Sequence, residues 1–183
     1  MVAIRAKRRE AALLALDTLD AAEVVRYHHL QEKVELAAGV EARLAQIART
    51  YYRATGRTIL VTSGTRDALS QADAMYGKLF HGANIVALYS QRDAARTLRD
   101  IFRRGRRAKG ARSEIVEEMG AFIRSQMDEG LFISKHLLAG AVDVRSRDMT
   151  ARQKRAFRTA VKVEPGVRCL LERRPPHFHL SFD

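Results

Sequence analysis

The decapeptide SKHLLAGAVD at residues 134–143, together with the tripeptide HFH at residues 177–179, decides how this chain is interpreted. Three of the six histidines and one aspartate lie in these two segments, and apolar residues flank each of them. Such surroundings predict that the imidazole and carboxylate groups are buried in a sheet. Histidine and aspartate gathered in a buried environment are typical of a metal site, which is what we expect here.

The HFH tripeptide has the alternation of a β-strand. Side chains two residues apart on a strand point to the same face, so His177 and His179 would project together. The opposite face would carry Phe178, Leu180 and Phe182. This strand would therefore present two imidazoles on one face and apolar side chains on the other.

His136 and Asp143 lie seven residues apart across Gly140. This separation lets the chain leave one strand, turn, and return in the next. Two imidazoles and one carboxylate on a shared sheet face would make three protein ligands, which leave a fourth zinc position for water. Open sites of this kind are catalytic. The alternative is that each histidine is an ordinary hydrogen-bonded core residue, because His-x-His also occurs by chance.

The two segments together resemble the zinc signature of the D-alanyl-D-alanine carboxypeptidase and endopeptidase group, which includes lysostaphin and the hedgehog amino-terminal domain. Members carry Ser-x-His-x-x-Gly-x-Ala-x-Asp and, downstream, His-x-His or a single histidine after an aromatic residue. Ser134, His136, Ala141 and Asp143 match the first motif. The resemblance implies that His136, Asp143 and His179 hold Zn²⁺.

The same resemblance assigns two further roles. His177 matches the histidine that faces the tetrahedral intermediate, and Ser134 would support the site. This chain has Ala139 where the group usually has glycine, with Gly140 next. Glycine adopts backbone angles that alanine resists, so we expect the turn to be displaced by one residue.

The stretch ILVTSGTR at residues 59–66, followed by Gln71, extends the resemblance upstream. The group has an apolar strand that ends in Ser-Gly-x-Arg-x-x-x-x-Gln, and Ser63, Arg66 and Gln71 reproduce that spacing. These residues would bind substrate, because a guanidinium can hold a peptide carboxylate or carbonyl with two parallel hydrogen bonds. The alternative for Arg66 is a surface charge, since the chain has 33 basic residues.

Hydrolysis also needs a base that removes a proton from water. Glu172 lies seven residues before His179 and ends the apolar run 167–172, which predicts a strand. A short hairpin through residues 173–176 would return the chain beside the histidines. In the resembled group a carboxylate just before the last ligand is the base. Glu172 could instead pair with a neighbouring arginine, and Asp148 is the other candidate base.

The overall pattern predicts an α+β domain with helices packed on one side of a small, mostly antiparallel sheet that carries the zinc site, as in the resembled group. We expect one zinc peptidase domain over residues 1–183, with a helical part at 1–57 and a catalytic core at 58–183. Gly56 and Gly130 would end helices, and Ser113 and Thr150 would begin them. The expected helices are 6–19, 40–54, 67–80, 91–104, 114–129 and 150–161, and the expected strands are 58–62, 141–145, 167–172 and the one around 177–182.

Length and composition set the remaining limits. No apolar run approaches 18 residues, so we expect no transmembrane helix. The basic amino terminus is followed by too short an apolar run, 11–16, for a classical signal peptide. We therefore expect synthesis in the cytoplasm and action in the periplasm or cell wall after delivery by other means. The single cysteine, Cys169, predicts an inert buried thiol and no internal disulfide, which disfavours a Cys-His peptidase.

The net charge of +12 favours polyanionic partners. The charge is densest at residues 103–112, where two glycines predict a mobile loop. The expected partners are peptidoglycan peptides, anionic wall polymers or lipid on the basic surface, and a cognate inhibitor protein. No specific nucleic acid is expected, because no nucleic-acid motif accompanies the charge.

These observations favour a zinc metallopeptidase that cuts peptidoglycan stem peptides as a D-alanyl-D-alanine carboxypeptidase or as an endopeptidase. Its setting would be a phage lysis enzyme or a secreted antibacterial effector. Two alternatives stay open. One is a basic, non-catalytic binding module of the same fold, and the other is a nucleic-acid-binding protein with structural histidines.

Overall fold

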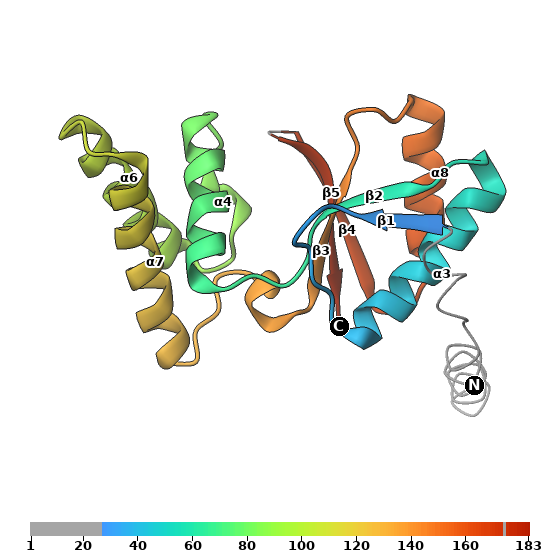
Figure 1. Ribbon diagram of the computed structural model, residues 1–183, viewed down its shortest axis with the longest axis horizontal. Coiled ribbons are helices and arrows are strands. Elements are labelled where there is room, and N and C mark those ends of the chain that lie inside the picture. The colour runs from blue at the N-terminus through green and yellow to red at the C-terminus, as the bar shows by residue number, and fades with distance from the viewer. Residues whose placement is uncertain (1–26, 174) are drawn as a thin grey trace.

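A five-stranded mixed sheet with the strand order β1-β2-β3-β5-β4 forms the centre of the fold (Figure 1). The computed structural model describes residues 27–173 and 175–183. β1 runs parallel to β2, and all other neighbouring strands are antiparallel. The predicted α+β class is confirmed, although the sequence pattern did not predict β1. The strands are β1 (His28–Leu30), β2 (Ile59–Ser63), β3 (Ala141–Arg145), β4 (Val167–Arg173) and β5 (Pro176–Phe182).

Two helices, α3 (Ala38–Thr55) and α8 (Ala151–Lys162), pack against the sheet and share a core with it. Phe178 and Leu180 of β5 lie fully buried in this core, and the Phe178 ring packs against Phe157 of α8. The predicted alternation along β5 is thus confirmed. The other face of the strand, with its two histidines, is turned away from α3 and α8. We call this part, residues 27–63 and 135–183 without residue 174, the sheet lobe.

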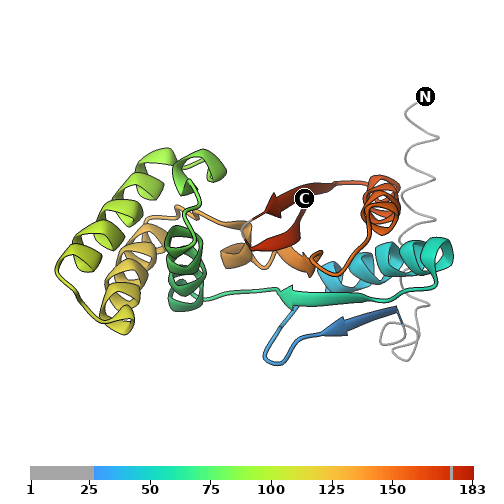
Figure 2. The same ribbon diagram turned by 90° about the horizontal axis from the view of Figure 1, so that it is seen from above.

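A second group of helices, residues 68–128, forms what we call the helical lobe. It lies beside the sheet lobe, away from α3 and α8 (Figures 1 and 2). The lobe has a hydrophobic core of its own, in which Met75, Leu98 and Met119 are completely buried. Residues 64–67 and 129–134 connect it to the sheet lobe, and the short 3₁₀ helix η1 (Lys135–Leu138) follows. Its helices are α4 (Ala68–Phe80), α5 (Ile85–Leu88), α6 (Arg92–Arg107) and α7 (Arg112–Asp128).

Of the four predicted helix ends, those at Gly56, Gly130 and Thr150 are confirmed and the one at Ser113 is wrong. Gly56 follows α3 with a φ of 67°, which glycine adopts without strain. Thr150 caps α8, because its hydroxyl accepts a hydrogen bond from the Gln153 backbone N–H. Ser113 does not cap α7. The helix begins at Arg112, two residues before the expected start at 114, and the carboxylate of Glu114 accepts a hydrogen bond from the backbone N–H of Ala111, the N-cap residue.

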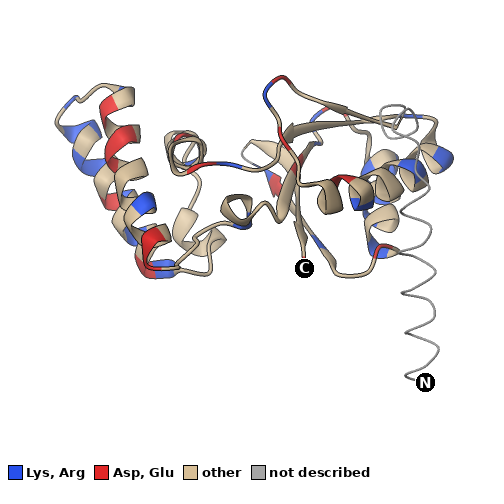
Figure 3. Ribbon diagram, turned by 60° about the horizontal axis from the view of Figure 1, so that its bottom comes forward, with Lys and Arg blue, Asp and Glu red and all other residues tan. Residues whose placement is uncertain are grey.

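The basic segment 103–112 is mostly helical, so the prediction of a mobile loop was wrong. α6 continues to Arg107, and only residues 108–111 connect it to α7. A Cβ on Gly105 would lie 2.5 Å from Cγ1 of Ile115, so this glycine allows α6 and α7 to pack closely. The arginines therefore lie on an ordered helix surface, which Figure 3 shows in blue.

The helix expected at residues 6–19 lies outside the described residues. α3, which belongs to the helical part expected at 1–57, packs in the same core as the strands. Among the described residues, no helix has both the length and the apolar character needed to cross a bilayer.

Candidate metal centre

The open face of the sheet carries the residues that the two sequence segments single out. β3 supplies Asp143, and its Cα partner on β5 is His179. His136 lies on η1 and not on a strand, which corrects the prediction. The Ser134 hydroxyl caps η1 by accepting a hydrogen bond from the His136 backbone N–H. A 3₁₀ turn, instead of a strand, therefore aims His136 at the sheet.

The turn after His136 is not displaced to Gly140. Ala139 itself has a φ of 53° and a ψ of 20°, the left-handed conformation that glycine adopts more easily. The backbone N–H of Gly140 closes the turn by donating to the carbonyl of Lys135. The turn therefore lies at residue 139, where the zinc motif of the similar group has glycine, although this chain has alanine there.

His136, Asp143 and His179 converge as predicted. Each offers one ligand atom, and these atoms all lie within 4.8 Å of one another. His136 and Asp143 are only 2% and 6% exposed. Two imidazole nitrogens and one carboxylate oxygen at such separations could hold a metal ion.

The hydrogen bonds of His136 leave a lone pair aimed at Asp143. Its Nδ1 lies 2.6 Å from the carbonyl oxygen of Gly64, which can only accept, so Nδ1 carries the proton. Burial lowers the pKa of His136, and the nearby Asp143 carboxylate only partly offsets this. In the neutral ring Nε2 is bare, yet it lies 3.3 Å from Asp143 Oδ1. Two acceptors this close have no proton to share, and a bound cation would satisfy both.

Asp143 is held with one carboxylate oxygen toward the imidazoles. Its Oδ2 accepts a hydrogen bond of 2.7 Å from Nη2 of Arg66, while its Oδ1 lies 2.9 Å from His179 Nδ1. Burial alone would raise the pKa of Asp143, but its polar neighbours, among them His179 and the Arg66 guanidinium, lower it well below its ordinary value. The aspartate is thus a carboxylate with Oδ1 available as a ligand.

His177 and Glu172 lie next to this group, because they are cross-strand partners on β5 and β4. His177 Nε2 lies 3.7 Å from Glu172 Oε2 and 3.4 Å from Asp143 Oδ1, and it has no hydrogen-bond partner. Its Nδ1 donates to the carbonyl of Pro175. Nε2 of a neutral His177 is therefore bare, and only the imidazolium can donate from Nε2 to a substrate oxygen.

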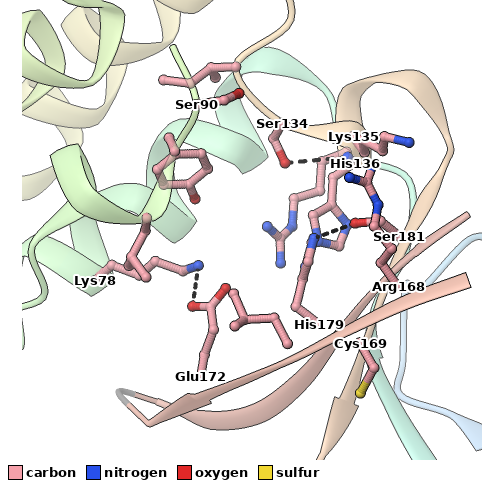
Figure 4. Close-up of a pocket in the computed structure, with 15 residues that line it drawn as sticks. Lys78, Ser90, Ser134, Lys135, His136, Arg168, Cys169, Glu172, His179 and Ser181 are labelled. Atoms are coloured by element: carbon pink, nitrogen blue, oxygen red, sulfur yellow. Dashed lines mark hydrogen bonds and ion pairs between the residues drawn. The ribbon is translucent and has the colours of Figure 1, made fainter. Parts of the chain in front are cut away.

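Lys78 is the site residue that the sequence reasoning missed. It comes from α4 in the helical lobe, and its Nζ lies 2.6 Å from Glu172 Oε2 (Figure 4). Both side chains are buried. Burial alone would lower the pKa of Lys78, but Tyr89 and Glu172 raise it above its ordinary value. The sequence does contain one indication of this role. Lys78 lies three residues after Met75, on the buried face of α4, where a lysine needs a charged partner.

Arg66 reaches the cleft, but the other upstream residues do not line it. Nη1 of Arg66 donates to Gln71 Oε1, and Gln71 is completely buried, so it positions the arginine. Ser63 lies on β2 as the Cα partner of Asp143, outside the cleft lining. Asp148 is exposed and pairs with Arg145, so the structure does not bring it to the histidines.

The centre opens into a cleft of about 350 Å³ between the two lobes (Figure 4). Seven of the nine buried polar residues among those described belong to this centre: Gln71, Lys78, Ser134, His136, Asp143, Glu172 and His177. Buried polar groups are costly unless they serve a purpose, so their concentration marks a functional site.

Cys169 also lines the cleft. Burial raises the pKa of its thiol to about 11, so the group is protonated at neutral pH. A protonated thiol is a poor nucleophile. Cys169 is half-buried and not fully buried as expected, but its protonated thiol agrees with the expectation of an inert cysteine.

Comparison with protein-family models, with curated proteins and with solved structures found no match to this chain.

Proposed function

We propose that this protein is a zinc-dependent peptidase that hydrolyses bonds in the stem peptides of bacterial peptidoglycan. The observation that carries the proposal is the convergence of His136, Asp143 and His179, with Glu172 and His177 beside them. The motif that contains these residues resembles the zinc signature of the peptidoglycan peptidase group. The proposal therefore combines a metal-binding geometry with a matching sequence pattern.

His136, Asp143 and His179 would hold the ion. The donor set fits zinc, because the tautomer of His136 and the orientation of Asp143 leave lone pairs that face one another. A zinc ion with three protein ligands supplies Lewis-acid activation of water and of a substrate carbonyl. The ring N–H of His136 donates to a backbone carbonyl, which fixes the orientation of the ring.

The remaining residues would handle protons and charge. Glu172 accepts the proton of the attacking water and passes it to the leaving amine. His177, as an imidazolium, donates from Nε2 to the carbonyl oxygen as negative charge develops there. Arg66 holds Asp143 in place, and it keeps further N–H groups for a substrate carbonyl. Lys78 fixes Glu172 at the edge of the cleft.

The site of action would be the periplasm or the cell wall, where peptidoglycan occurs. The protein would reach it as a phage lysis enzyme or as a secreted antibacterial effector. Anionic wall polymers or lipid would then meet the basic surface of α6, and a cognate inhibitor protein would protect the producing cell.

One observation favours a second candidate, a binding module that holds the ion without turnover. The Lys78 ammonium donates to Glu172 Oε2 at 2.6 Å, so this carboxylate oxygen already has a charged partner. For Glu172 to act as the base of a peptidase, its carboxylate would have to be able to accept a proton when substrate is bound. The module and the peptidase differ in turnover and not in metal binding.

The test measures zinc content and the release of amino groups from purified peptidoglycan. We expect the wild type to bind one zinc ion per chain and to cleave. His136→Ala should lose both zinc and activity, whereas Glu172→Gln should keep zinc and lose activity by about 10²- to 10⁴-fold. Glu117→Gln, an exposed position on α7, is the matched control and should behave as the wild type.

Zinc binding without cleavage by the wild type would establish the module instead of the peptidase. Normal hydrolysis by Glu172→Gln would remove Glu172 as the base, although it would leave the metal site intact.

A further inference from the structure

The cleft does not end at Glu172. A second hollow of about 390 Å³ begins there and extends along the segment between α4 and α5 toward Arg173. The two cavities share three lining residues, Leu88, Leu170 and Glu172. The metal centre therefore lies within a longer groove and not at its closed end.

The junction of the two cavities is apolar and open. Leu88 comes from α5 in the helical lobe and Leu170 from β4 in the sheet lobe, so one side chain belongs to each wall. They are 41% and 50% exposed, so both offer apolar surface to a ligand in the groove. A peptide that passes Glu172 would cover both leucines and remove their apolar surface from water.

The cations of the cleft are already paired. Arg66 contacts Asp143, Lys78 contacts Glu172, and Lys135 and Arg168 both contact Asp183. These four are all the lysines and arginines in the lining of the metal cleft. A carboxypeptidase must bind the terminal carboxylate of its substrate, and a carboxylate is held best by an unpaired cation. In the metal cleft, the terminal carboxylate of a substrate would have to compete for each of these four side chains with an aspartate or glutamate of the protein.

We propose that the groove binds a peptide that continues on both sides of the bond to be cut, so that the enzyme is an endopeptidase for cross-linked stem peptides. This inference rests on the proposed function and adds to it the class of substrate. One side of the substrate lies along Ser134 and Ser181, and the other passes Leu88 and Leu170 into the second hollow. Arg66 would then contact a neutral carbonyl within the peptide.

The test offers the zinc-loaded wild type two substrates purified from the same peptidoglycan. One is the monomer with a pentapeptide stem that ends in a free D-alanine carboxylate, and the other is the cross-linked dimer. Chromatography with mass spectrometry follows both products. We expect conversion of dimer to monomer at least about tenfold faster than the release of D-alanine, because the free carboxylate, one residue from the bond to be cut, finds no unpaired lysine or arginine in the lining of the metal cleft.

The outcomes separate this inference from the proposed function. Faster release of D-alanine from the monomer would overturn the endopeptidase assignment and leave the peptidase proposal standing. Cleavage of neither substrate would overturn both.

A variant tests the second hollow directly. Ala87 is exposed on α5 and lines only this hollow, so Ala87→Trp would fill it without touching the metal centre. We expect an unchanged zinc content and melting temperature, and cleavage of the dimer slowed by about tenfold or more. Ala54→Trp, at an exposed position of α3 outside both cavities, is the control. Cleavage of the dimer by Ala87→Trp at the rate of the wild type would contradict the use of this hollow.

Discussion

The two lobes contribute to the centre in different ways. The sheet lobe supplies all three candidate ligands and the pair of Glu172 and His177, positioned by η1 and by adjacent strands. The helical lobe has its own hydrophobic core and supplies mainly Lys78, which crosses the cleft to Glu172. A sheet fixes side chains by its register, whereas two packed lobes can only be fixed by the contacts between them. The ligand set should therefore be robust, and the placement of the base should depend on how the lobes meet.

The largest expected effect comes from breaking the contact between the lobes. Lys78→Met leaves the buried carboxylate of Glu172 without its lysine partner, which should lower the free energy of unfolding by about 3–5 kcal/mol. The double variant Lys78→Met/Glu172→Gln removes both charges and should recover most of this loss. Urea unfolding measures both. A loss below about 0.5 kcal/mol for Lys78→Met would mean that the pair does not join the lobes.

The packing inside the helical lobe gives the next largest effect. Gly105→Ala places a methyl group 2.5 Å from Ile115 Cγ1, so we expect a loss of about 1–3 kcal/mol in the free energy of unfolding. Gly77→Ala is the control in the same lobe, because its added Cβ has no atom within 4 Å apart from its chain neighbours and the backbone of its own helix. It should instead stabilise α4 by about 0.5–1 kcal/mol. Thermal melts of the two variants should shift in opposite directions, and equal shifts would contradict the close contact of α6 and α7.

Acid should weaken the sheet lobe before the helical lobe. Burial, and secondarily His29, lowers the pKa of His28 on β1, and burial also lowers the pKa of His136. Below pH 6.5 the unfolded chain binds protons that the folded chain does not, so the free energy of unfolding decreases as the pH is lowered. The limit is about 1.4 kcal/mol per pH unit for each histidine. Above pH 6.5 the contribution is fully present.

Hydrogen exchange in the presence of EDTA tests this order. Protection should decrease in β1 and β2 as the pH is lowered from 7.5 to 5.5, while α4 and α7 change less. His28→Gln should reduce the pH dependence without removing it, since His136 is unchanged. An equal loss of protection in both lobes would contradict the prediction.

The smallest effect concerns the turn that follows His136. Ala139→Gly relieves a left-handed alanine and should stabilise the sheet lobe by about 1 kcal/mol. Gly140→Ala is the control, because Gly140 has no positive φ and its added Cβ would come no closer than 3.4 Å to any residue beyond its two chain neighbours. It should be close to neutral. Calorimetry would distinguish the two, and a destabilising Ala139→Gly would contradict the observed backbone conformation.

Local patterns in the sequence predicted much of the sheet lobe. The alternation around Phe178 placed β5 and its two faces, and Thr150 located the start of α8. The same kind of reasoning failed where a distant contact decides the structure. Gly105 suggested a loop, but it lies within α6, where the absence of a side chain leaves room for Ile115 of α7. Asp148 was a candidate base on its position in the sequence, yet it pairs with Arg145 on the surface.

The sequence by itself determined which residues could bind a metal, because ligand type and motif spacing are properties of the chain. It also determined the strand that carries His177 and His179, since alternation assigns faces without knowledge of the partner strand. Only the tertiary structure decided that Lys78 meets Glu172 and that the groove continues beyond the metal centre. Both depend on how two lobes with separate cores are packed against each other, and no local pattern encodes that arrangement.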